Sequence, residues 1–188
     1  MIGKKNIVFG FLFLVFTASL GPYMVTMYEG WGQAYGEKQQ SVGRLQQLQT
    51  DDFEEDLEPL NADQIARANT GGILAMNKLY NTELNIDMIK GGPHAHGNLE
   101  SVLNIIVGVV LLFVSASPLV KQIISWLFIL GTLLHSGMLY LERVLQLEFA
   151  ASYLQTSVAA IGPLMLLVGL LLMALVTAKS LRDHVVRD

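Results

Sequence analysis

Four apolar segments, each long enough to cross a lipid bilayer, constrain this chain more than any other feature of its sequence. They cover about residues 7–28, 98–117, 119–141 and 152–178. Crossing the hydrocarbon layer takes roughly 20 apolar residues in an α-helix, and these runs lack the strict alternation of a membrane β-strand. Backbone groups in lipid must be satisfied internally. We therefore expect an all-α integral membrane protein, with four transmembrane helices in an up-down bundle and a partly helical extracytoplasmic loop.

The composition agrees with a membrane protein and excludes several kinds of site. Hydrophobic residues make up 52% of the chain, which is more than a typical soluble domain carries. The sequence contains no cysteine, so disulfides, iron–sulfur clusters, thiolate zinc sites and cysteine nucleophiles are excluded. The net charge of −4 gives no basic surface for nucleic acid. Membrane lipid is the expected partner.

Six of the twelve basic residues set the expected orientation, because they lie near the two chain ends and in the short connection between the second and third segments. They are Lys4, Lys5, Lys121, Lys179, Arg182 and Arg187. Under four crossings all of them fall on one side, and cytoplasmic loops carry the excess of Lys and Arg. We therefore expect a bacterial cytoplasmic (inner) membrane with both termini in the cytoplasm. The chain then divides into a first helix (1–28), an outer loop (29–97), three further helices (98–178) and a cytoplasmic tail (179–188).

The predicted outer loop is acidic and partly helical. Eleven of the sixteen Asp and Glu residues lie between positions 29 and 87. Asn61 and Gln64 are spaced like a capping box at the start of a helix, which Gly71-Gly72 is expected to break or bend. The run DDFEEDLEP lacks the alternating ligands and central glycine of a calcium loop. We interpret it as a solvated acidic surface.

Polar residues gather at the outer end of the second apolar segment. His94 and His96 come first, and Glu100 and Asn104 follow within about two helical turns. His96, Glu100 and Asn104 share one face because they are four residues apart. Polar groups are costly inside a membrane and are functional candidates by default. We expect them to face the interior of the bundle and to contact a bound group.

The third apolar segment offers partners for these residues. Gly131, His135, Met138 and Glu142 recur every three or four residues along one stripe. Counting about 1.5 Å per residue from the middle of each span places His135 and His96 in the same leaflet, about 9 Å apart in depth. Met138 is a further candidate contact to a cofactor.

Glycine–proline pairs are expected at the same depth in the remaining two helices. Gly21-Pro22 and Gly162-Pro163 predict kinks in the outer halves of the first and fourth segments. The inner halves of all four segments are plain Leu, Val, Ile and Phe. The pattern therefore indicates a bound group in the outer leaflet.

Two kinds of bound group suit these side chains. A b-type haem would take His96 and His135 as axial ligands from facing helices, with Glu100 and Asn104 orienting an imidazole or contacting a propionate. A single transition-metal ion such as zinc, iron, manganese or copper would instead use His94, His96 and Glu100, with His135 and Glu142 as further candidates. His94 and His96 could reach one ion only where the backbone is not helical, which Gly91-Gly92-Pro93 allows.

The stretch PHAHGNLESVLNIIVG resembles the start of the second membrane helix in the catalytic subunit of haem–copper oxidases and nitric oxide reductases. In that family a histidine at the outer mouth ligates a low-spin haem. The resemblance covers sixteen residues and implies that His96, or else His94, is an axial ligand of haem b. The family has many more membrane helices and further histidines for a second haem and copper, so the reduction of oxygen or nitric oxide is not implied.

Three functions are consistent with the sequence. The first is a small membrane haem protein that transfers electrons or senses a redox ligand near the outer face. The second is a non-catalytic accessory subunit of a larger membrane complex, or a homo-oligomer, in which the polar stripe only joins helices. The third is a membrane protein that binds a metal ion through His and Glu. His184, in the charged tail, is expected to be solvated.

Overall fold

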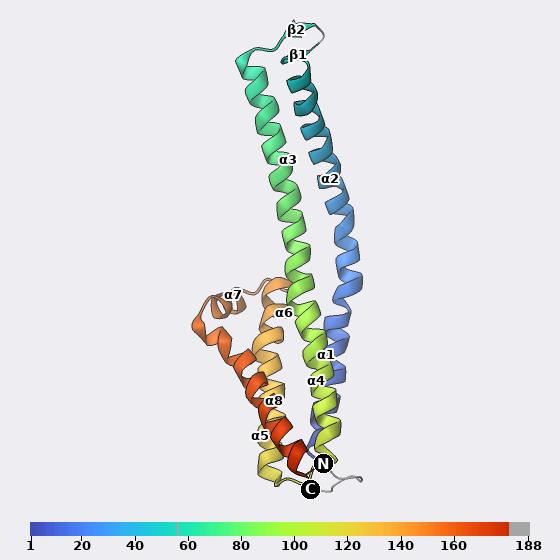
Figure 1. Ribbon diagram of the computed structural model, residues 1–188, viewed down its shortest axis with the longest axis vertical. Coiled ribbons are helices and arrows are strands. Elements are labelled where there is room, and N and C mark those ends of the chain that lie inside the picture. The colour runs from blue at the N-terminus through green and yellow to red at the C-terminus, as the bar shows by residue number, and fades with distance from the viewer. Residues whose placement is uncertain (56, 181–188) are drawn as a thin grey trace. The chain divides into compact units, whose positions relative to one another are not determined.

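The computed structural model describes residues 1–55 and 57–180 and is helical apart from one short β-ribbon (Figure 1). Residues 1–21 and 88 onward form one compact unit, and Pro22–Asp87 forms a second. The long helices are α1 (Gly3–Ala18), α2 (Leu20–Thr50), α3 (Ala62–Ile89), α4 (Ala95–Leu111), α5 (Pro118–Thr132) and α8 (Ile161–Ser180). The shorter elements are β1 (Glu54–Glu55), β2 (Glu58–Pro59), α6 (Met138–Arg143), α7 (Glu148–Leu154), the π-helical turns η1 (Lys90–His94) and η2 (Leu133–Gly137), and the 3₁₀ turn η3 (Ser157–Ala160).

Among the described residues, three helical stretches are long and apolar enough to span a membrane, as expected of a membrane protein. They are Gly3–Thr50, Pro118–Arg143 and Ser157–Ser180. These overlap the first, third and fourth predicted segments. The second predicted segment forms α4, whose polar side chains interrupt its apolar character. Four crossings therefore stay a prediction.

The unit of residues 22–87 is a helical hairpin. Figure 1 shows α2 and α3 antiparallel and joined through the β1–β2 ribbon. Buried or half-buried residues recur every three or four positions along both helices, as on one face of an amphipathic helix. In α2 they include Met24, Met27, Trp31, Ala34, Lys38, Ser41, Leu45 and Leu48, and in α3 Ile65, Ala68, Gly72, Ala75, Leu79, Thr82 and Ile86.

The start of α3 confirms one prediction and its middle corrects another. The Asn61 backbone N–H donates to Gln64 Oε1 (2.8 Å) and the Gln64 N–H donates to Asn61 Oδ1 (3.0 Å), which is the expected capping box. Gly71-Gly72 does not break the helix, which continues to Ile89. Gly72 instead faces Leu45, because a Cβ there would lie only 2.6 Å from Leu45 Cδ1. Close packing of the hairpin outweighs the low helix propensity of glycine.

In the other unit, α1 packs closely against α4 because small residues line both helices. A Cβ added to Gly108 would lie 2.7 Å from the carbonyl oxygen of Gly3, and one added to Gly10 would lie 2.6 Å from that of Ser101. Gly97 likewise faces Thr17. The predicted kink of the first segment is an interruption at Ser19, between α1 and α2, since Pro22 has no N–H to bond the carbonyl four residues earlier.

A second close pair is formed by α5 and α8, which lie side by side in Figure 1. Gly131 faces Leu166, and Gly169 faces the ring of Phe128. The prediction of an interior kink at Gly162-Pro163 is wrong, because α8 begins at Ile161 and Pro163 therefore lies in its first turn, where proline is tolerated.

Polar side chains join the two pairs in a layer that sequence analysis missed. Asn6 Nδ2 donates to Asn104 Oδ1 and to the Ser125 carbonyl oxygen, both at 3.1 Å, while Asn104 Nδ2 donates to Thr132 Oγ1 at 2.9 Å. All four side chains are completely buried. We expected the inner halves of the four segments to be purely apolar. This prediction is wrong, because the polar layer lies in the half of α1 that holds the N-terminus. Lys121, expected in a connection, is also buried in the first turn of α5.

Candidate metal centre

His96, Glu100 and His135 converge at the contact between α4 and the π-helical turn η2. His96 and Glu100 lie one turn apart on α4, as the spacing of four residues requires. His135 lies in the middle of η2, which follows α5. One ligand atom from each of the three side chains lies within 4.8 Å of the other two. Sequence analysis named all three residues as candidates.

Glu100 is the buried centre of this cluster. Its side chain is 5% exposed, and its Oε1 accepts a hydrogen bond from His135 Nδ1 at 2.5 Å. Its Oε2 accepts a second bond from Ser136 Oγ at 2.7 Å. A buried carboxylate is costly unless it is paired and hydrogen-bonded, so these two donors account for its presence inside the protein. Ser136 was not predicted, and its position beside His135 is the only sequence signal for it.

The two histidine rings lie in direct contact. Their centroids are 5.0 Å apart and their planes meet at 61°, an edge-to-face arrangement. The predicted depth difference of about 9 Å is therefore not found between the rings. His96 is exposed, His135 is half-buried and Glu100 is buried. The cluster thus has one buried and one open side.

Two π-helical turns flank the cluster. Lys90–His94 forms η1 immediately before α4, with Gly92 in a non-helical conformation (φ −84°, ψ −107°), and His135 lies within η2. Such turns insert a residue into a helix and are frequent at functional sites. Each shifts the direction of the side chains that follow it. The π turn at η2 therefore places His135 and Ser136 together on Glu100.

Two of the remaining candidates, Asn104 and His94, form hydrogen bonds with groups other than the three converging side chains. Asn104 lies one turn below Glu100 and bonds its carbonyl oxygen (3.0 Å), so it supports α4 from within the polar layer. His94 is directed elsewhere, since its Nδ1 donates to the Thr17 carbonyl oxygen at 2.9 Å. The non-helical turn therefore does not bring His94 and His96 to one point.

Glu142 and Met138 lie beyond η2 on α6. Glu142 forms an ion pair with Arg143 rather than joining the group of converging ligand atoms. Met138 is half-buried at the first residue of α6, and its role as a cofactor contact stays a prediction. His184 lies outside the described residues.

No protein-family model, curated protein or solved structure matches this chain. The interpretation of the site therefore depends on its own chemistry.

The donor set suits a single transition-metal ion. Two imidazoles and one carboxylate form the ligand set of catalytic zinc sites and of non-haem iron(II) sites with open positions. A haem held between His96 and His135 would need a porphyrin plane between the two rings. Rings with centroids 5.0 Å apart in edge contact leave no space for it. Haem b therefore stays a prediction that would require the two histidines to separate.

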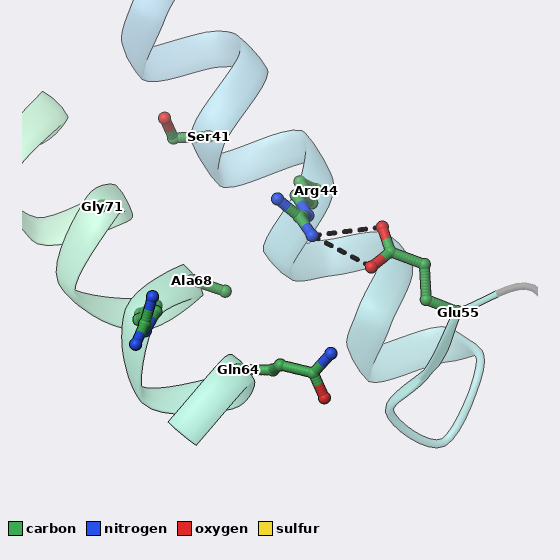
Figure 2. Close-up of a pocket in the computed structure, with 7 residues that line it drawn as sticks. Ser41, Arg44, Glu55, Gln64, Ala68 and Gly71 are labelled. Atoms are coloured by element: carbon green, nitrogen blue, oxygen red, sulfur yellow. Dashed lines mark hydrogen bonds and ion pairs between the residues drawn. The ribbon is translucent and has the colours of Figure 1, made fainter. Parts of the chain in front are cut away.

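The hairpin carries a second set of charged groups around an open pocket of about 310 Å³, drawn in Figure 2. Arg44 donates both hydrogen bonds to the carboxylate of Glu55 there, at 3.0 and 3.1 Å. Arg67 also lines the pocket and pairs with Asp63. Both guanidinium groups thus already have carboxylate partners, and both ion pairs are exposed. We interpret this pocket as a solvated surface of the hairpin.

Proposed function

We propose that this protein is a multi-pass membrane protein that binds a single first-row transition-metal ion through His96, Glu100 and His135. The observation that carries the proposal is the convergence of their ligand atoms within 4.8 Å between two helix pairs, around the buried carboxylate of Glu100. Ionisable groups at such a depth are expensive and mark functional sites in membrane proteins.

The contacts of Glu100 support a site that can exchange a proton for a metal. Its carboxylate is aligned by Ser136, and its other oxygen meets a His135 nitrogen at 2.5 Å. A ligand histidine must offer an unprotonated nitrogen to a metal. His135 can do so by giving its Nδ1 proton away, or by keeping that bond and coordinating through Nε2, with the carboxylate then orienting the ring. A carboxylate oxygen that accepts one hydrogen bond keeps a further lone pair, so Glu100 can bind the same ion in either case.

The proposal places α1, α4, α5 and α8 across the membrane, with α4 as the predicted second crossing, although α4 is not among the three stretches that are long and apolar enough by themselves. Contacts with α4 occur near both ends of α1, at Gly3 and at Thr17. A helix that accompanies a membrane span over its whole length crosses the same hydrocarbon layer. The buried polar side chains of α4 form hydrogen bonds within the protein, as polar groups surrounded by lipid must. The basic residues support cytoplasmic termini and a site near the outer face.

Cobalt(II) titration of the purified protein in detergent tests this function. Cobalt(II) bound by nitrogen and oxygen ligands gives visible absorption bands whose intensity reports the coordination. We expect bands that saturate at one ion per chain in the wild-type protein. His135→Asn keeps a hydrogen-bond donor near the position of Nδ1 but removes the imidazole, so it should weaken binding by at least about 10-fold.

His94→Ala is the matched control for this titration. It removes an imidazole two residues from His96 that is bonded to Thr17 instead, and it should leave the bands unchanged. Wild-type protein that takes up no cobalt would end the proposal, as would equal uptake by the wild-type and His135→Asn proteins. The cluster would then be a polar helix–helix contact, and the accessory-subunit hypothesis would take its place.

A further inference from the structure

Few side chains among the described residues can bind this ion. Within residues 1–55 and 57–180, the converging His and carboxylate groups are three. First-row ions in protein sites take four to six ligands, by the geometries typical of zinc, iron and copper. At least one coordination position must therefore be filled by something else.

The neighbouring polar side chains already have other partners. Asn104 Oδ1 accepts from Asn6, and its Nδ2 donates to Thr132 Oγ1 and to the Glu100 carbonyl oxygen. The Ser136 hydroxyl donates to Glu100 Oε2. Recruiting any of them as a ligand would break a buried hydrogen bond, which is costly.

The open side of the cluster lies at His96. Glu100 is 4% exposed and contacts His135 on its inner side, whereas His96 is exposed. A ligand from outside the chain can therefore approach an ion on the side of the exposed His96 ring.

From this count of ligands we infer that the ion takes an exogenous ligand on the His96 side. This inference rests on the proposed metal site. The ligand class is a water molecule or a small anion such as azide. The ion then occupies an open site rather than a closed structural one, since closed sites fill every position with side chains.

Azide titration of the cobalt-loaded protein tests the inference. Because azide changes the field at an open cobalt(II) position, we expect the visible bands to shift with saturation at one azide per ion. Solvent-proton relaxation of the manganese(II)-loaded protein should also show an exchanging bound water. His94→Ala, which leaves the open side intact, should respond like the wild-type protein.

The two proposals fail in different ways. A protein that binds no cobalt contradicts the metal site itself. Cobalt bands that saturate but are unaffected by azide, together with no exchanging water, would show a full set of protein ligands and would overturn this inference while leaving the metal site in place. A response to either probe supports it.

Discussion

The contact between α1 and α4 can be tested with one methyl group, because it is closer than any side chain allows. A Cβ added at Gly108 would lie 2.7 Å from the Gly3 carbonyl oxygen and 2.9 Å from the Ile7 backbone nitrogen. Ordinary contact begins at 3.4 Å, so α1 would have to move away by about 0.7 Å. Neither partner atom can rotate aside, since both belong to the backbone of a packed helix.

Gly108→Ala should therefore lower the free energy of unfolding. Overpacking a close contact costs about 1–3 kcal/mol, whereas replacing glycine by alanine in a helix gains up to about 1 kcal/mol. With the full gain subtracted, the expected net loss is about 0–2 kcal/mol, by the same principles. Thermal unfolding in detergent, followed by circular dichroism, measures it.

Gly43→Ala is the matched control for this substitution. Gly43 lies inside α2 with no atom within 4 Å of an added Cβ, so only the gain in helix propensity applies there. The two identical substitutions should have opposite signs. If Gly108→Ala stabilises the protein as much as Gly43→Ala does, the close packing of α1 against α4 is wrong.

Four further predictions concern single side chains. Asn104→Ala removes hydrogen bonds to three buried partners and should cost about 1–3 kcal/mol of unfolding free energy, measured by the same thermal assay. Met138→Leu preserves the side-chain volume and should leave the cobalt absorption spectrum unchanged, because the proposed ligands do not include the Met138 sulfur. A changed spectrum would show that this sulfur is a ligand. His184→Ala should change neither metal binding nor thermal stability. Arg44→Ala breaks an exposed ion pair with Glu55 and should change the unfolding free energy by less than about 1 kcal/mol.

From the sequence we could predict which residues lie together in the candidate site, but not the distances between them. His96, Glu100 and His135 could be named because of their spacing and their cost in a membrane, but His96 is exposed rather than facing the interior of the bundle as expected. Their distances could not be predicted, since counting residues along straight helices ignores the π turn that redirects His135. Sequence analysis also gave no reason to place Ser136 on the carboxylate.

Errors elsewhere have similar causes. Asn6 was overlooked because it directly follows two lysines and precedes the apolar run, although its side chain is completely buried. Pro163 was placed inside a helix because the apolar composition continues past the true start of α8. Gly72 was read as a breaker, whereas its missing side chain admits Leu45. In each case the partner on another helix decides the structure, and that partner is distant in the sequence.

Elemental analysis combined with an absorption spectrum of the same purified sample tests the central claim most directly. After equilibration with first-row metals and removal of free ions, the account predicts one metal ion per wild-type chain, no Soret band, and loss of the ion in His135→Asn. Protein that retains no metal would contradict the account. So would a Soret band that disappears in the variant, because the iron would then be held as haem.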